Sequence, residues 1–213
     1  MTYLFLSFTA AIFLHLVFGA LTIVWCGVKI TEICYGTGPK LVSFGKITIR
    51  LIPISGYARM LDSRENHLEE HELQFAYNLK PSFVRAFIMV SGSISLILIA
   101  ELLIGKQAFD YFTNAFGQIT RFILSPTQDA QVYIQKILDF TETSSIITIF
   151  SITLTKIAAI NLLPIPALNG GSALLELINL NKKHRLFILK AGISVILLML
   201  LSVGIAIINF ICF

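Results

Sequence analysis

Long apolar stretches separated by polar segments make up most of this 213-residue chain. A helix needs about 20 apolar residues to cross the hydrocarbon core of a bilayer, and several stretches reach or approach that length. They are residues 2–27, 83–104, 146–163 and 186–210. The first has no basic residue before its apolar run and is too long for a cleavable signal sequence, so we expect a transmembrane helix there. The pattern predicts an all-α polytopic membrane protein with about four transmembrane helices.

Between the first two apolar stretches the pattern changes to strict alternation. Polar and apolar side chains alternate over residues 46–51, with Gly45 before them and Pro53 shortly after them. A period of two bracketed by such residues indicates a short strand and not a helix. We expect a small β-hairpin or sheet here, which is either an ordinary cytoplasmic hairpin or one associated with the membrane.

The segment between the second and third stretches, residues 105–143, is amphipathic. Apolar residues group at helical spacing on both sides of Ser125 and Pro126, which divide the segment in two. We expect two helices that lie in the bilayer interface. The chain contains no internal repeat, and we expect a single membrane domain over residues 1–213.

The composition supports a membrane protein, because 56% of the residues are hydrophobic and only 13% are charged. A water-soluble fold of this size would lack the polar residues needed to cover its surface. The three cysteines are an odd number without paired spacing and indicate neither a disulfide framework nor a metal motif. The net charge of +4 is modest, and we expect no nucleic-acid partner.

Basic residues are distributed unevenly among the segments that connect the apolar stretches. The first and last connecting segments are rich in them, whereas the middle one contains only Lys106, Arg121 and Lys136. Because cytoplasmic loops carry the excess of Lys and Arg, the first and third segments should face the cytoplasm. Both termini are then expected on the non-cytoplasmic side. The basic residues of the cytoplasmic segments are Lys29, Lys40, Lys46, Arg50, Arg59, Arg64, Lys80, Lys182, Lys183 and Arg185.

Two segments far apart in the sequence carry the candidate chemistry. Residues 13–19 read FLHLVFG, and residues 161–171 read NLLPIPALNGG. Together they resemble the site-2 protease family of intramembrane zinc metalloproteases, in which the first segment contains His-Glu-x-x-His and the second ends in Leu-Asp-Gly-Gly. Residues 26–28 read CGV, as they often do in that family, and set the register independently. The resemblance extends over nearly the whole chain.

The resemblance implies where a catalytic zinc would be held, and the residues at those positions differ from the family. A catalytic zinc takes three protein ligands and keeps an open position for water, which a nearby base activates. The first ligand position holds His15, but the position of the base holds Leu16 and that of the second ligand Gly19. The third ligand position holds Asn169, whose neutral amide is a poor zinc ligand. We therefore interpret these positions as a degenerate catalytic site, and we expect no bound metal or other cofactor.

Other polar residues could still form a metal site or be buried. Residues 67–71 read HLEEH, the inverted zinc signature, but they lie in an acidic segment typical of a solvated surface. A histidine inside a membrane helix is a functional candidate by default, yet His15 could equally be hydrogen-bonded across helices as a remnant of the site. Lys156 lies well inside the third apolar stretch. Its ammonium either reaches a headgroup or lies in the cavity left by the metal, pointing toward Asn169.

The resemblance also implies a way to bind peptides. Asn161 matches the family position that helps to hold substrate backbone, and the family binds substrate by adding it to a strand edge. We expect that edge at Lys46, Ile47, Thr48, Ile49 and Arg50. Many relatives insert a PDZ domain between the corresponding helices, but residues 105–143 are too few to form one.

We therefore predict a pseudoprotease and not an enzyme, which binds a transmembrane peptide or other membrane protein subunits as part of a complex in the lipid bilayer. The bacterial inner membrane is the expected location. The alternative is an active intramembrane zinc metalloprotease whose site is unconventional and uses His15, or His67 with His71.

Overall fold

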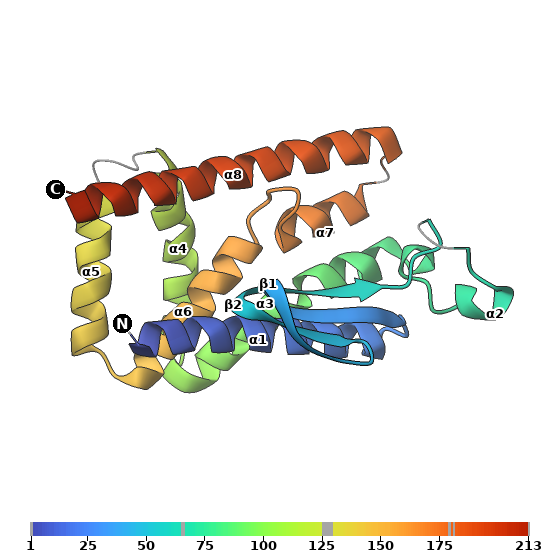
Figure 1. Cartoon of the computed structure of the whole chain (residues 1–213), viewed down its shortest axis with the longest axis horizontal. Helices are drawn as coiled ribbons and strands as arrows, with labels where there is room; N and C mark the ends of the chain where they lie inside the picture. The colour runs from blue at the N-terminus through green and yellow to red at the C-terminus, as the bar shows by residue number, and fades with distance from the viewer. Residues whose placement is uncertain (1, 65–66, 125–129, 179, 181, 213) are drawn as a thin grey trace.

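The structure is a computed structural model that describes residues 2–64, 67–124, 130–178, 180 and 182–212. It is mostly helical with one small antiparallel sheet, which confirms the predicted fold class (Figure 1). In chain order the elements are α1 (Thr2–Trp25), β1 (Ile30–Phe44), β2 (Ile47–Met60), α2 (Glu70–Leu73), a 3-10 turn (Tyr77–Leu79), α3 (Ser82–Ile104), α4 (Gln107–Leu124), α5 (Ala130–Thr143), α6 (Ile146–Asn161), α7 (Asn169–Leu177) and α8 (Lys182–Cys212).

Three helices of the described part of the chain, α1, α3 and α8, are long and apolar enough to cross a membrane. The third expected span forms the shorter helix α6, which has 16 residues. The helix ends at Asn161 because Pro164 follows closely, and a residue preceding a proline and the proline itself are both disfavoured in a helix. The helical segments thus match the predicted positions, but α6 on its own is shorter than a usual membrane span.

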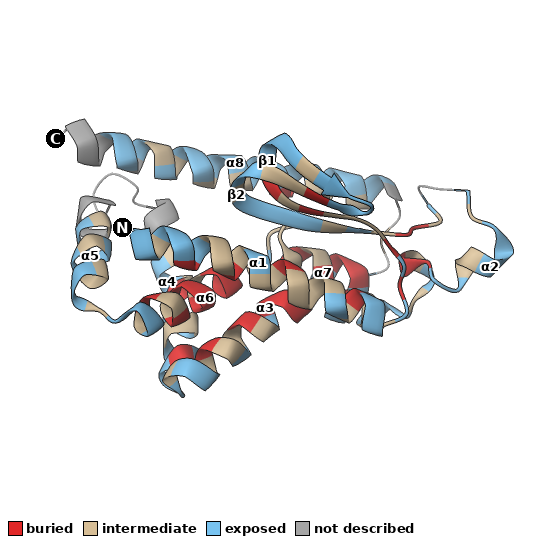
Figure 2. Cartoon of the chain, turned by 60° about the horizontal axis from the view of Figure 1, so that its bottom comes forward, coloured by how far each residue is buried: buried red, intermediate tan, exposed pale blue. Residues whose placement is uncertain are grey.

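Helices α1, α3 and α6 pack together around small side chains. Ala11, Ala100 and Ala158 are fully buried between them, and Leu96 and Leu154 fill the space around these alanines. Small residues let helices approach closely, which is the usual basis of helix packing in membranes. The buried surface lies on the facing sides of α3, α6 and α7, whereas α8 is mostly exposed (Figure 2).

The predicted strand is confirmed, but it is one part of a longer hairpin. The pairing places Ile33 of β1 opposite both Ile47 and Ala58 of β2, and the N–H of Ile33 donates to the Lys46 carbonyl at 2.7 Å. The first half of β1 therefore has β2 on both sides. This arrangement leaves residues 40–44 and 56–60 at the outside of the sheet.

The segment 105–143 divides into two helices, α4 and α5, as predicted, although Ser125 and Pro126 themselves lie outside the described residues. Both helices run across the direction of α1 and α8, near the N-terminal end of the chain (Figure 1). One face of α4 is in contact with protein, since Ala108 and Ala115 are fully buried and α4 packs mainly on α6. Location of the two helices in the bilayer interface stays a prediction.

Candidate functional site

The structure brings together the two segments that are 154 residues apart in the sequence. The side chain of His15, in the middle of α1, lies beside that of Asn169, the first residue of α7. Asn169 Nδ2 is 3.0 Å from His15 Nε2, and Ser93 Oγ of α3 is 3.3 Å from the same nitrogen. With the imidazole proton on Nδ1, Nε2 accepts hydrogen bonds from the amide and the hydroxyl. We call His15, Leu16, Gly19 and Asn169 the His15 site.

The turn between α6 and α7 places Asn169 at this point. Ala167, two residues earlier, has a φ of 92°, a left-handed conformation that is uncommon for a residue with a side chain. The two glycines after Asn169 are needed for close packing against the turn. A Cβ on Gly170 would lie 2.3 Å from the Leu162 carbonyl oxygen, and one on Gly171 would lie 2.2 Å from the Ile165 carbonyl carbon.

Gly92 determines how closely α3 approaches His15. A Cβ on this glycine would lie 2.7 Å from the His15 carbonyl oxygen and 3.0 Å from its ring atoms Cδ2 and Nε2. Real Cβ atoms essentially never make contacts that short, so a larger residue would displace the two helices. The close approach brings the neighbouring residue Ser93 within reach of the imidazole.

The two remaining positions of the His15 site hold apolar residues in different environments. Leu16 is only 8% exposed, and a Cβ built on Gly56 of β2 would lie 3.1 Å from Leu16 Cδ2. Leu16 therefore packs against the sheet. Gly19, one turn further along α1, has open space where a Cβ would be, with no heavy atom within 4 Å. The family position of the base is thus occupied by the packed side chain of Leu16, and that of the second ligand, at Gly19, is open space.

The side chains that meet here do not fit a catalytic zinc. They offer one imidazole and one neutral amide, and the amide nitrogen faces the nitrogen that would have to bind the metal. A zinc site of this kind takes three protein ligands, drawn from imidazole, carboxylate and thiolate groups. Within the described part of the chain, no group of three or more His, Cys, Asp or Glu side chains could hold a metal ion.

Two cavities meet at His15 and Asn169. The larger, of about 380 Å³, is bounded by α1, β2, α6 and the turn before α7, and Asn161 and Ser55 line it. The smaller, of about 180 Å³, extends between α1, β2 and α3 and includes the open space at Gly19. His15, Gly56 and Asn169 line both cavities.

The residues predicted to bind peptide divide into two groups. Asn161 lines the larger cavity, and its Nδ2 donates to the Ile157 carbonyl at 3.0 Å. The strand segment from Lys46 to Arg50 lies elsewhere. Its Thr48 is opposite both Ser43 and Cys34, so the backbone has neighbours on two sides and no open edge. The part of β2 that lines the two cavities is residues 54–60 instead.

Lys156, which was expected to be buried like His15, is half-buried and does not contact Asn169. Its ammonium hydrogen-bonds the side-chain oxygen of Gln118 on α4 and does not point to Asn169. The α4 helix thus supplies a neutral acceptor for the one charged residue of α6.

The residues of the inverted zinc signature, 67–71, do not form a set of metal ligands. His67 and His71 lie on an exposed segment around α2, and His71 Nδ1 is 3.2 Å from a carboxylate oxygen of Glu69. The side chains of His71 and Glu69 are 73% and 79% exposed, as a solvated surface predicts.

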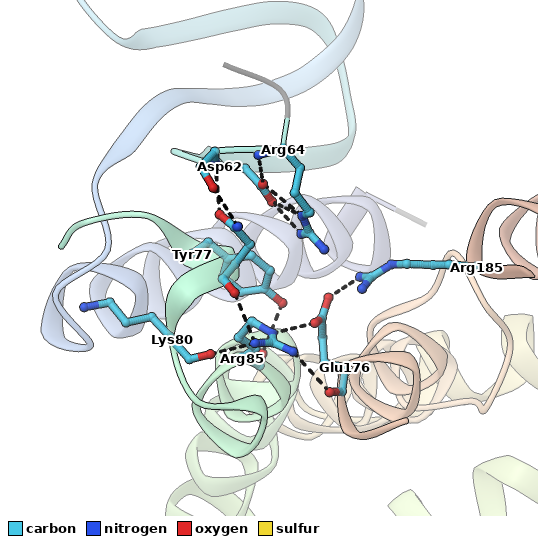
Figure 3. Close-up of polar contacts among 9 residues, drawn as sticks. Asp62, Arg64, Tyr77, Lys80, Arg85, Glu176 and Arg185 are labelled. Atoms are coloured by element: carbon cyan, nitrogen blue, oxygen red, sulfur yellow. Dashed lines mark hydrogen bonds and ion pairs between the residues drawn. The ribbon is translucent and has the colours of Figure 1, made fainter. Parts of the chain in front are cut away.

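Sequence reasoning missed a buried cluster of charges near the other end of α7. Glu176 has a side chain with 0% exposure and is held by two arginines (Figure 3). Arg85 Nε donates to one carboxylate oxygen at 2.6 Å, and Arg185 donates to the other. We call Arg85, Glu176 and Arg185 the charge cluster. A sequence signal did exist, because Glu176 is the single acidic residue between positions 161 and 180.

The cluster joins three elements and fixes the charge of its carboxylate. Arg85 belongs to α3, Glu176 to α7 and Arg185 to α8, and the Tyr77 hydroxyl donates to the Arg85 carbonyl at 3.4 Å. Burial acts to raise the pKa of Glu176, but the hydrogen bonds from Arg185 and Arg85 outweigh it and hold the pKa below its usual value. Glu176 is therefore ionised at neutral pH.

Comparison with known proteins agrees with the arrangement of the His15 site. The chain is 34% identical over 95 residues to proteins named "Putative zinc metalloprotease" from two strains of Xylella fastidiosa, Temecula1 and 9a5c. Each match covers 39% of this chain and 21% of the relative, so the chain spans about a fifth of the length of these relatives. The family model "Peptidase family M50" matches residues 3–204. With His15 and Asn169 side by side at the two motif positions, the chain belongs to peptidase family M50, the site-2 proteases.

Proposed function

We propose that this chain is a catalytically inactive member of its family that binds a membrane peptide as a subunit of a membrane protein complex. The observation that carries the proposal is which side chains form the His15 site. Leu16 and Gly19 stand at the positions of the base and the second ligand, and the Asn169 amide faces His15 Nε2. The larger cavity supports binding, because it is lined by Asn161 and by the part of β2 near Ser55.

The strand edge that would receive a peptide is residues 54–58 of β2, in place of the segment first predicted. Ile54 and Ser55 have no strand partner in the pairing between β1 and β2, and they line the larger cavity. An extended peptide lying there would gain main-chain hydrogen bonds from this edge.

The proposed location is the bacterial inner membrane with both termini on the non-cytoplasmic side. Basic residues at the ends of several elements support this orientation, since Lys29 follows α1, Lys80 precedes α3 and Arg185 lies in the first turn of α8. These ends lie together at the side of the molecule opposite the N-terminus (Figure 1). Cytoplasmic ends of membrane helices carry such an excess of positive charge.

Zinc content tests the loss of catalysis. The purified chain is expected to contain no stoichiometric zinc, because one imidazole and one amide do not hold it. Stoichiometric zinc bound with submicromolar affinity would overturn the proposal and favour an active metalloprotease with an unconventional site. The matched control is Gly19→His combined with Asn169→Asp, which uses the open space at Gly19 and should gain zinc.

Adding Leu16→Glu to that control supplies a base but places a carboxylate against the sheet at Gly56. The triple variant is expected to bind zinc and to show weak or no proteolysis, because its surroundings no longer orient the ligands. A folded triple variant without zinc would contradict the assignment of these positions.

Photo-crosslinking tests the peptide-binding role. A photoreactive residue at Ser55 is expected to capture a defined membrane partner, whereas one at Leu102, which is 87% exposed on α3, should capture none specifically. The change Ile54→Pro removes a backbone donor from the edge and should weaken the capture at Ser55. Equal products at Ser55 and Leu102 would argue against the binding role.

A further inference from the structure

The proposed peptide-binding role uses the larger cavity and assigns no role to the smaller one. It occupies the space on the side of His15 where Gly19 stands at a ligand position, and its volume is about 180 Å³. Apolar residues supply most of its wall, including Ala20 and Ile23 of α1, Ala58 of β2, and Ile88 and Met89 of α3. An apolar cavity of about 150 Å³ holds a benzene-sized group.

Two polar residues of this cavity, His15 and Asn169, lie where it meets the larger one, whereas Tyr57 lines only the smaller one. His15 and Asn169 line both cavities, and their side chains are already hydrogen-bonded to each other. The wall of the smaller cavity is therefore mainly apolar. A charged or strongly polar group placed inside would lose its hydration without gaining a partner, which disfavours such a group.

The sheet connects this cavity to the peptide edge. Gly56 lines both cavities, and residues on either side of it line one cavity each, Ser55 the larger and Tyr57 the smaller. Side chains of an extended peptide point alternately to opposite faces. A peptide lying along residues 54–56 in the larger cavity can therefore direct one side chain past His15 into the smaller one.

We propose that the smaller cavity is a specificity pocket for one large apolar side chain, Leu, Met or Phe, of the bound peptide. The pocket exists because Gly19 leaves open space at the ligand position and Leu16 keeps the neighbouring wall apolar. This inference rests on the proposed peptide-binding function and adds the chemistry by which a partner is chosen.

The experiment measures binding of labelled five-residue peptides, Thr-Val-X-Val-Thr, to the full chain in lipid nanodiscs by fluorescence polarisation. The variable residue X is Leu, Met, Phe, Ala or Asp. Peptides with Leu, Met or Phe are expected to bind about tenfold more tightly than the Ala peptide, in line with the usual value of filling an apolar pocket. The Asp peptide is expected to bind no better than the Ala peptide.

Filling the pocket gives the decisive comparison. The change Gly19→Leu, or Ala20→Leu as a second variant, should reduce the preference for large apolar residues over Ala to less than about twofold. Gly204→Leu on α8 is the matched control, since a Cβ there also meets no atom within 4 Å, and it should keep the full preference. Binding that is equal for all five peptides, or a preference that survives both filled variants, would overturn the pocket but leave the peptide-binding function standing. Failure of every peptide to bind would instead count against the proposed function itself.

Discussion

Helix α7 has a polar side chain near each end, and the two have different surroundings. Asn169 at its start is a neutral amide and contacts the imidazole of His15, whereas Glu176 near its end is charged, fully buried and held by two arginines. A buried charge is tolerated when it is paired, and a neutral amide needs only hydrogen bonds. The comparison teaches that a change at Asn169 removes only neutral hydrogen bonds, whereas a change at Glu176 leaves two arginines without their anion.

The largest expected effect comes from breaking the charge cluster. Glu176→Gln keeps the shape of the side chain but leaves Arg85 and Arg185 without their anion, and we expect a loss of about 3 kcal/mol in the free energy of unfolding. Thermal unfolding of the purified protein measures the effect. The control Glu72→Gln removes the partner of Lys29 in an ion pair near the surface and should leave the melting temperature nearly unchanged. Equal behaviour of the two variants would show that the cluster is not important for stability.

Acid should break the same cluster without a mutation. The folded-state pKa of Glu176 lies below the ordinary value of 4.5, so the ionised carboxylate contributes stability above that value. This contribution is lost as the pH falls through the lower folded-state pKa. The melting temperature is expected to decrease below about pH 4.5 in the wild type and to decrease less steeply in Glu176→Gln. Parallel curves for both proteins would assign the acid sensitivity to other carboxylates, such as Asp62.

A substitution at Gly92 should have an intermediate effect. The Cβ of Gly92→Ala would overlap the backbone and ring of His15, and overpacking of this kind costs about 1–3 kcal/mol. Gly117→Ala on α4 is the control, because no heavy atom lies within 4 Å of its Cβ position, and it should be neutral or slightly stabilising. Thermal unfolding of both variants measures the difference. A neutral Gly92→Ala would mean that α1 and α3 are able to separate at the His15 site.

The smallest effect is expected at Lys156. Its ammonium hydrogen-bonds the neutral side-chain oxygen of Gln118 on α4, so Lys156→Met removes one hydrogen bond between helices. Hydrogen bonds between membrane helices contribute about 0.6 kcal/mol on average. The melting temperature should therefore change little, and Gln118→Leu, which leaves the ammonium without its acceptor, should destabilise the protein more. A large loss in Lys156→Met would place this residue with the charge cluster as a determinant of stability.

The sequence determined the helical segments, the strand and the register of the two motifs. Long apolar runs can satisfy their backbone hydrogen bonds in a membrane only by forming helices or closed barrels, so residues 83–104 form α3 nearly as predicted. The motif segments are recognisable without coordinates, because His15 and Asn169 keep their positions relative to CGV at residues 26–28 and to the prolines of the turn. The sequence implied that these two residues are close only through the family resemblance. The structure shows it directly, with Asn169 Nδ2 3.0 Å from His15 Nε2.

Tertiary structure decided the features that depend on contacts between distant elements. The alternating pattern of residues 46–51 identifies a strand but does not say which strands flank it, and the fold pairs it on both sides so that the outer segments of the sheet are residues 40–44 and 56–60. The partner of Lys156 depends on the packing of α4 on α6. The charge cluster joins residues of α3, α7 and α8, and the cavity at Gly19 depends on how β2 and α3 surround α1. Local periodicity reports which face of an element is apolar, but the neighbour of that face is set by packing of the whole chain.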